Sequence, residues 1–147
     1  MADPTAKPPT YIHLRPGKDP PTLAPQPYRI VIVAESSVSD DWREDIAEWI
    51  WQIGSRYVVA WGQSCEVWHD SVDFANLAAF DFGDVPDKDS IMTTWHSGEP
   101  LSEVFWFAGF CAYHPDVQLG DTILLHIAEE GREGPMLEGY SLAQISD

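Results

Sequence analysis

The clearest hydrophobic pattern in the chain runs from residue 28 to residue 55. Residues 30–34 consist only of Ile, Val and Ala, which is typical of a strand covered by helices on both faces. Asp41 and Glu44 have the spacing of a helix capping box. The apolar residues that follow recur with a helical period and are Trp42, Ile46, Trp49, Ile50 and Ile53. This stretch therefore predicts a central strand, a short turn and an amphipathic helix.

The same alternation continues along the rest of the chain. Apolar runs predict further strands at residues 57–61, 91–95 and 122–128, and helical patterns predict helices at about 70–80 and 101–113. Repeated strand and helix units predict an α/β three-layer sandwich, with helices on both faces of a mostly parallel four-stranded sheet. Counting these four strands along the chain, we expect the flavodoxin-like order 2-1-3-4. The direction of the last strand is left open.

The two ends of the chain differ in composition from the middle. Residues 1–27 contain eight prolines and almost no apolar periodicity, which predicts an extended or disordered arm. Residues 28–128 carry the α/β pattern and form the predicted domain. Residues 129–147 read as a polar C-terminal tail that ends in a short helix.

The net charge of the chain says more about its function than its length does. The chain of 147 residues has 8 Lys and Arg against 24 Asp and Glu, a net charge of −16. Residues 1–27 hold three basic and two acidic residues, so the remaining residues carry −17. This field opposes direct binding to nucleic acid or to an anionic membrane, and it accelerates encounter with a basic partner. The plain alternative is that the acids serve solubility alone.

Cysteine content and hydropathy bear on location. Cys65 and Cys111 form no metal-binding or redox pattern, which suits a reducing compartment. The N-terminus has no apolar signal-peptide region, and no run approaches the 18 apolar residues of a membrane span. We therefore expect a cytoplasmic protein.

Four short segments, AWGQSC, FDFG, MTTWH and EPLSEVFWF, together resemble an uncharacterised family of small bacterial α/β domains. The resemblance covers roughly residues 28–128. It implies a bacterial origin and an α/β fold, and it assigns no activity and no site residue.

One candidate site is catalytic. In the predicted strand order, the loops after the first three strands converge at the carboxyl edge of the sheet and deliver Glu35, Cys65 and His96. A nearby His favours the Cys thiolate, and a carboxylate orients that His. This cluster would serve a small thiol-dependent or hydrolytic enzyme. Against it, a free Cys is more often a packing residue.

Metal chemistry is a weaker alternative. Imidazole and carboxylate groups that suit Zn²⁺ or Mn²⁺ occur at His69, Asp70, Asp73, His96 and Glu99. Their spacing matches no metal motif, so we predict no metal and no cofactor. His126 lies inside an apolar strand and is expected to be a core histidine with its hydrogen bonds satisfied.

The leading hypothesis is a binding surface on the first helix. Trp51 falls opposite the buried stripe, among Asp40, Glu44 and Glu48. Either another part of the chain covers Trp51, or it anchors a partner. We expect a non-catalytic interaction protein that binds a basic partner, as an immunity protein or antitoxin-like inhibitor would. A second copy could also pack on the apolar third helix through Trp106 and Phe110.

Overall fold

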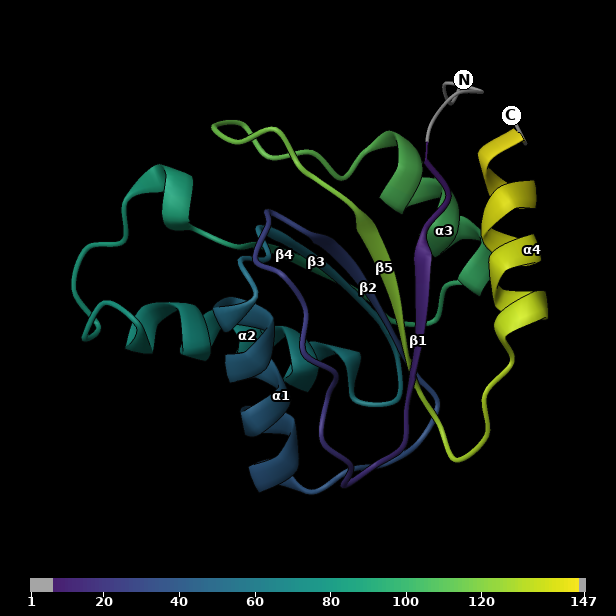
Figure 1. Cartoon of the computed structure of the whole chain (residues 1–147), viewed down its shortest axis with the longest axis horizontal. Coiled ribbons are helices and arrows are strands. Elements are labelled where there is room, and N and C mark those ends of the chain that lie inside the picture. The colour runs from purple at the N-terminus through teal and green to yellow at the C-terminus, as the bar shows by residue number, and fades with distance from the viewer. Residues whose placement is uncertain (1–6, 146–147) are drawn as a thin grey trace.

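The computed structural model describes residues 7–145, which form a parallel sheet between two layers of helices (Figure 1). The strands in this part of the chain are β1 (Thr10–Leu14), β2 (Arg29–Ala34), β3 (Tyr57–Gly62), β4 (Met92–His96) and β5 (Thr122–Ile127). The helices are α1 (Asp40–Gln52), α2 (Cys65–Ala78), α3 (Leu101–Phe110) and α4 (Glu133–Ile145), with a short 3-10 turn, η1 (Asp87–Asp89). The predicted α/β class is confirmed.

The predicted strand order and strand number were wrong. The sheet has five strands in the order β1-β5-β2-β3-β4, so the four predicted strands follow the order 4-1-2-3. Apolar content explains the difference. Strand β5 is buried at every residue after Thr122 and lies inside the sheet, whereas β4 exposes Met92 and Trp95 and lies at an edge. The prediction had placed these two strands the other way round.

Strand β1 lies within the segment predicted as an arm and pairs in parallel with β5. The Pro-rich residues 15–28 then run over α1 to reach β2, in the position where a helix would connect two parallel strands. The indole N–H groups of Trp42 and Trp49 donate to the backbone oxygens of Lys18 and Pro21, at 2.9 and 3.1 Å. Residues 7–27 of the predicted arm are therefore part of the domain, and residues 1–6 of it lie outside the described residues.

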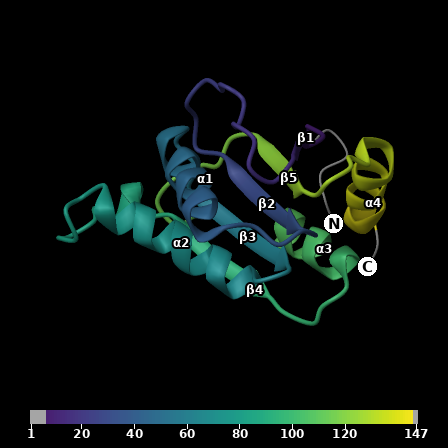
Figure 2. The same ribbon diagram turned by 90° about the horizontal axis from the view of Figure 1, so that it is seen from below.

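Two hydrophobic layers hold the sheet between the helices. Helices α1 and α2 cover one face, and α3 and α4 cover the other (Figure 2). Side chains of β2 alternate between the layers, with Ile30 and Ile32 facing α1 and α2 and Val31 and Val33 facing α3 and α4. Both layers consist of buried apolar side chains, and β2 is buried on both faces as its composition predicts.

Helices α2 and α4 are longer than the sequence pattern indicates. Helix α2 begins at Cys65, directly after Ser64 in a left-handed conformation, instead of near residue 70. Helix α4 occupies most of the predicted tail and packs on α3 through Met136 and Tyr140. None of the helices between residues 7 and 145 is long and apolar enough to cross a membrane.

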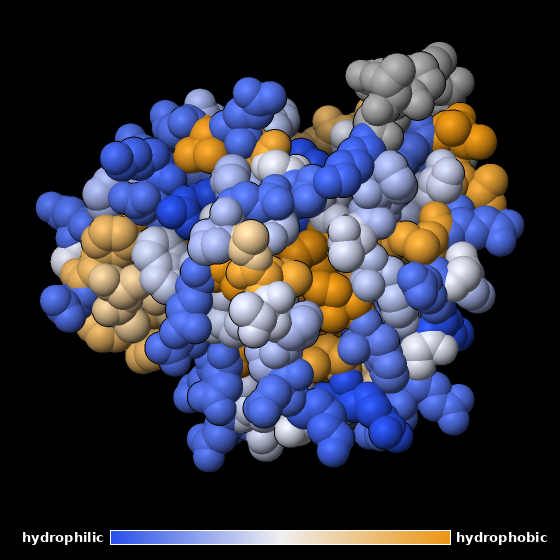
Figure 3. Space-filling model, in the orientation of Figure 1, coloured by the Kyte–Doolittle hydropathy of each residue, from blue (hydrophilic) through white to orange (hydrophobic). Residues whose placement is uncertain are grey.

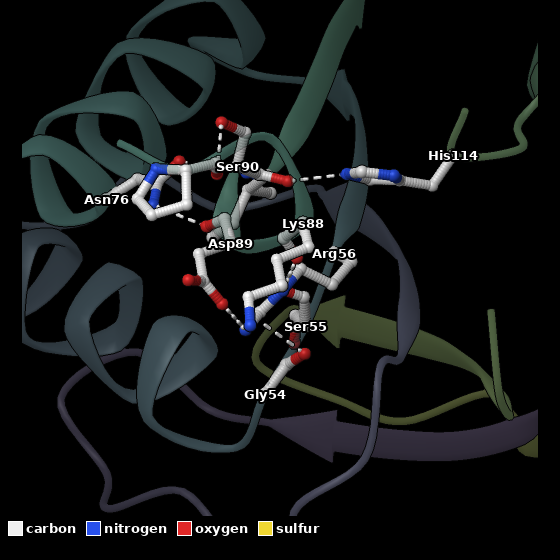
Figure 4. Close-up of polar contacts among 10 residues, drawn as sticks. Gly54, Ser55, Arg56, Asn76, Lys88, Asp89, Ser90 and His114 are labelled. Atoms are coloured by element: carbon white, nitrogen blue, oxygen red, sulfur yellow. Dashed lines mark hydrogen bonds and ion pairs between the residues drawn. The ribbon is translucent and has the colours of Figure 1, made fainter. Parts of the chain in front are cut away.

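A polar network fastens the loop between α2 and β4 to the amino edge of the sheet (Figure 4). Arg56 pairs with Asp89 at 3.3 Å. Asn76 donates to the backbone oxygen of Asp89, and His114 donates to that of Ser90. Because these bonds come from α2 and from the segments before β3 and after α3, the loop between α2 and β4 has a defined position.

Candidate functional site

The proposed thiol cluster does not assemble in the structure. Cys65 is buried in the hydrophobic layer under α1 and α2. His96 packs against Phe107 of α3, with ring centres 4.7 Å apart, and so lies on the other side of the sheet. Strand β3 lies between β2, which ends just before Glu35, and β4, which ends at His96. The sheet itself therefore keeps the thiol and the imidazole apart.

His96 has other partners. Its Nδ1 lies 2.9 Å from Glu99, and its Nε2 lies 3.0 Å from the hydroxyl of Thr94. Both ring nitrogens are thus used within its own strand and the loop that follows. This arrangement fixes the loop before α3 and leaves the ring no free nitrogen for Cys65.

Glu35 belongs to a closed ring of hydrogen bonds, which we call the carboxyl-edge ring and define as Tyr11, Glu35, His126 and Arg132. The backbone N–H of Arg132 donates to the hydroxyl of Tyr11 at 2.8 Å. That hydroxyl lies 2.7 Å from Nδ1 of His126, whose Nε2 lies 2.5 Å from Glu35. Arg132 closes the ring with a 3.0 Å bond to the other Glu35 oxygen.

This ring occupies the true switch point of the sheet. The chain moves outward from β2 to β4 and then returns to β5 on the other side of β2. Ligands in parallel sheets often bind at such a point. Here, however, both nitrogens of the fully buried His126 and both oxygens of Glu35 are bonded within the ring. The ring therefore joins β1, β2, β5 and the start of α4, and His126 is confirmed as a satisfied core histidine.

Electrostatics keep Glu35 and Arg132 of the ring charged at neutral pH. Burial raises the pKa of the Glu35 carboxyl, but hydrogen bonds from Arg132 and His126 outweigh burial and bring this pKa below its ordinary value. The hydrogen bond to Glu35 raises the pKa of Arg132. Glu35 and Arg132 thus stabilise each other as an ion pair.

The alternative metal ligands are also arranged as local pairs. His69 contacts Asp70 at 3.0 Å and Asp73 at 3.3 Å, and its ring packs on Trp95. Within residues 7–145 no group of three or more His, Cys, Asp or Glu side chains has the geometry of a metal site.

A groove of about 420 Å³ lies between α1 and α2, which run side by side on one face of the sheet (Figure 2). Helix α1 lines it with Glu44, Asp45, Glu48, Trp51 and Gln52. The other wall consists of Ser71, Phe74, Ala75, Ala78 and Ala79. Small alanine side chains on α2 leave the space open, and acids stand along the α1 side.

Internal contacts lie at both ends of this groove. At one end, Arg43 donates to the hydroxyl of Ser71 at 3.0 Å. At the other, Trp51 meets Phe80 edge to face at 5.6 Å, and the guanidinium of Arg56 lies 5.0 Å from the centre of the Trp51 ring. Trp51 therefore forms part of the wall of the groove.

The structure groups three of the four predicted partner-binding residues. Glu44, Glu48 and Trp51 all line the groove. Asp40 instead pairs with Arg43 at 2.8 Å, at the start of α1. Trp51 is partly buried and packs against the hydrophobic layer under α1 and α2. Its ring also contacts Phe80, which follows α2, and Arg56.

Sequence reasoning missed the second wall of the groove. It started α2 near residue 70, but the helix begins at Cys65 and leaves Phe74 and Leu77 exposed. A helix started at Cys65 gives the buried stripe Cys65, Trp68, Val72 and Asn76. That spacing puts Phe74 and Leu77 on the outer side. The sequence therefore predicts this wall of the groove once the helix is started at Cys65.

On the opposite side of the molecule, Trp106 and Phe110 stack with ring centres 5.4 Å apart. Trp106 is 37% exposed, and Phe110 is partly buried. The rings cover each other on α3. The expectation that they contact a second copy stays a prediction.

Comparison with known proteins places the chain in one family. Residues 9–143 match DUF7684, a domain of unknown function. The chain belongs to this family. The match includes β1 and most of α4, so both ends of the described structure are part of the family domain. No curated protein and no solved structure matches the chain.

Proposed function

We propose that this DUF7684 domain is a non-catalytic interaction protein that binds a basic segment of a partner protein in the groove between α1 and α2. The groove itself carries the proposal, since exposed Glu44, Asp45 and Glu48 stand beside an apolar wall. Among the described residues, the side chains of Glu44 and Asp45 have no hydrogen-bond or ion-pair partner. These acids are available to a partner's cations.

The charge of the whole chain supports the same proposal. A net charge of −16 attracts a basic partner over a long distance and accelerates its encounter. Lys and Arg side chains combine an aliphatic stem with a charged end, so they match a groove with one apolar and one acidic wall. An inhibitor that neutralises a basic, nucleic-acid-binding protein would have this surface. The free thiols of Cys65 and Cys111 suit the cytosolic location included in the proposal.

The alternative enzyme would need a different site. Its three proposed residues, Cys65, His96 and Glu35, lie in separate environments with separate partners. The interaction proposal therefore has the stronger geometric support.

Affinity capture with matched variants tests the proposal. The double variant Glu44→Lys and Glu48→Lys reverses the groove charge, and we expect it to lose a basic protein that the wild type captures. Glu103→Lys with Glu138→Lys makes the same change in net charge on α3 and α4, so we expect it to retain that protein. Raising salt to about 0.5 M should weaken capture by the wild type.

Two outcomes would contradict the proposal. Equal loss in both double variants would show that overall charge, and not the groove, attracts the partner. If the amount of captured protein is the same for the groove variant and at high salt, the groove does not bind its partner electrostatically. Trp51→Ala is a poorer probe because Trp51 also packs against Phe80 and Arg56.

A further inference from the structure

Helix α2 ends in a turn whose geometry is only partly explained by helix capping. The backbone N–H of Asp81 donates to Ala78 at 3.1 Å, and that of Phe82 donates to Leu77 at 2.9 Å. This pair of bonds is a Schellman motif, which needs one left-handed residue after the helix. Asp81 supplies it, with a φ of 53°.

Phe82 is also left-handed, with a φ of 60°, although the motif does not require it. A left-handed conformation is unfavourable for a bulky side chain and marks a position held by something other than backbone preference. Gly83 follows directly and is not among the residues with positive φ. The strained left-handed backbone conformation of this turn therefore falls on Phe82 and not on Gly83.

The strained residue presents its ring to solvent. Phe82 is 59% exposed and Phe74 is 57% exposed, and their ring centres lie 5.2 Å apart. Phe74 also lines the groove between α1 and α2. Figure 3 shows pale orange, moderately hydrophobic side chains over the end of α2 and the loop that follows, at the left of the molecule. The two rings thus form an exposed apolar patch beside the acidic groove.

Core packing does not account for a ring that is both strained and exposed. We propose that Phe74 and Phe82 are the apolar anchor of the docking surface, and that its occupant is an amphipathic helix with a cationic stripe beside an apolar stripe. This inference rests on the proposed function. It adds the class of partner and the residues that select it.

The spacing of the groove residues fits a helix. Glu44 and Glu48 are four residues apart, so they stand one turn apart along α1. Cations four residues apart on an opposing helix have the same spacing. Phe74 and Ala78 repeat that spacing on the facing wall. A helix that lies over the groove would therefore meet acids on the α1 side and apolar groups on the α2 side.

A synthetic peptide of about 18 Lys and Leu residues, with Leu at helical spacing, tests this inference on the full chain. A peptide of the same composition in scrambled order keeps the charge and loses the apolar stripe. We expect the wild type to bind the ordered peptide at least about tenfold more tightly than the scrambled one. Equal binding of the two peptides would overturn the inference.

The decisive variant is Phe82→Gly, because glycine adopts the left-handed conformation freely. We expect it to weaken binding of the ordered peptide by about fivefold or more while Tm stays unchanged or rises. Phe74→Ala should weaken binding in the same way. Tyr113→Ala removes an aromatic ring that is 72% exposed and follows α3, and it should leave binding unchanged.

The variants separate the two proposals. If Phe82→Gly leaves binding unchanged but charge reversal at Glu44 and Glu48 abolishes it, the aromatic anchor is wrong and the acidic groove stands. If neither change affects binding, both proposals fail. A fall in Tm for Phe82→Gly would show that the ring is held by packing within the fold, which contradicts the anchor.

Discussion

The carboxyl-edge ring and the groove between α1 and α2 both contain glutamates, but they use them in opposite ways. In the ring, both oxygens of Glu35 are bonded, to a buried His126 and to Arg132. In the groove, Glu44 and Asp45 have no side-chain partner among the described residues. One region satisfies its charge internally, whereas the other leaves it exposed beside apolar surface.

This difference separates stability from recognition. A carboxylate whose partners come from the same chain contributes to folding, and its removal leaves buried groups unpaired. An exposed carboxylate without such partners contributes little to folding and is free to meet a partner. Whether an acidic side chain serves folding or binding depends more on its partners within the chain than on its place at a sheet edge or on a helix.

Replacing His126 with Ala should give the largest loss of stability. The change removes a fully buried ring and leaves Tyr11 and Glu35 without their shared partner. We expect a loss of about 3 kcal/mol in the free energy of unfolding, measured by urea denaturation. His13→Ala, which removes one bond to the backbone of Ala128 on the same face, is the matched control and should cost about 1 kcal/mol. A loss below that of the control would contradict the role of the ring.

Acid should weaken the ring through Glu35. Its pKa is lowered in the folded protein, so its contribution is complete above the ordinary Glu value of about 4.3 and disappears as pH falls through the folded value. We expect Tm of the wild type to exceed that of Glu35→Gln at pH 7. The gap should narrow below about pH 4.5. A gap that stays constant down to pH 3 would show that ionisation of Glu35 contributes nothing.

In the groove, Glu44→Lys should leave the free energy of unfolding within about 0.5 kcal/mol of wild type, because its side chain is exposed. The same variant should weaken binding of the cationic peptide severalfold, as measured by isothermal titration. A large loss of stability with unchanged affinity would reverse the proposed division between the two regions.

Asp40→Asn should have the smallest effect. Asp40 is an exposed carboxylate that pairs with Arg43 outside the groove, so we expect a change below about 1 kcal/mol and no change in peptide affinity. A clear loss of affinity would extend the binding surface to the start of α1.

The sequence identified the elements better than their arrangement. Apolar runs located β2, β3 and β5, because buried strands and their composition are locally linked. Strand β1 was missed since its pairing with β5 depends on residues more than 100 positions away in the chain. The wrong strand order placed the switch point between β2 and β4 instead of between β2 and β5. Glu35 was therefore predicted to lie near Cys65 and His96, whereas it contacts His126 and Arg132. Helical periodicity alone brings Glu44, Glu48 and Trp51 together in the groove. It placed Asp40 with them, but Asp40 lies outside the groove and pairs with Arg43.

The most direct test of the account is to map where a cationic amphipathic helix binds, by titrating the isotope-labelled chain with the ordered Lys and Leu peptide and following its amide NMR signals. We predict the largest shifts at Glu44, Glu48, Ala75 and Phe82, which line or flank the groove. Signals from the carboxyl-edge ring, at Glu35 and Arg132, should stay in place. Shifts centred on the ring, with an unchanged groove, would contradict the central claim.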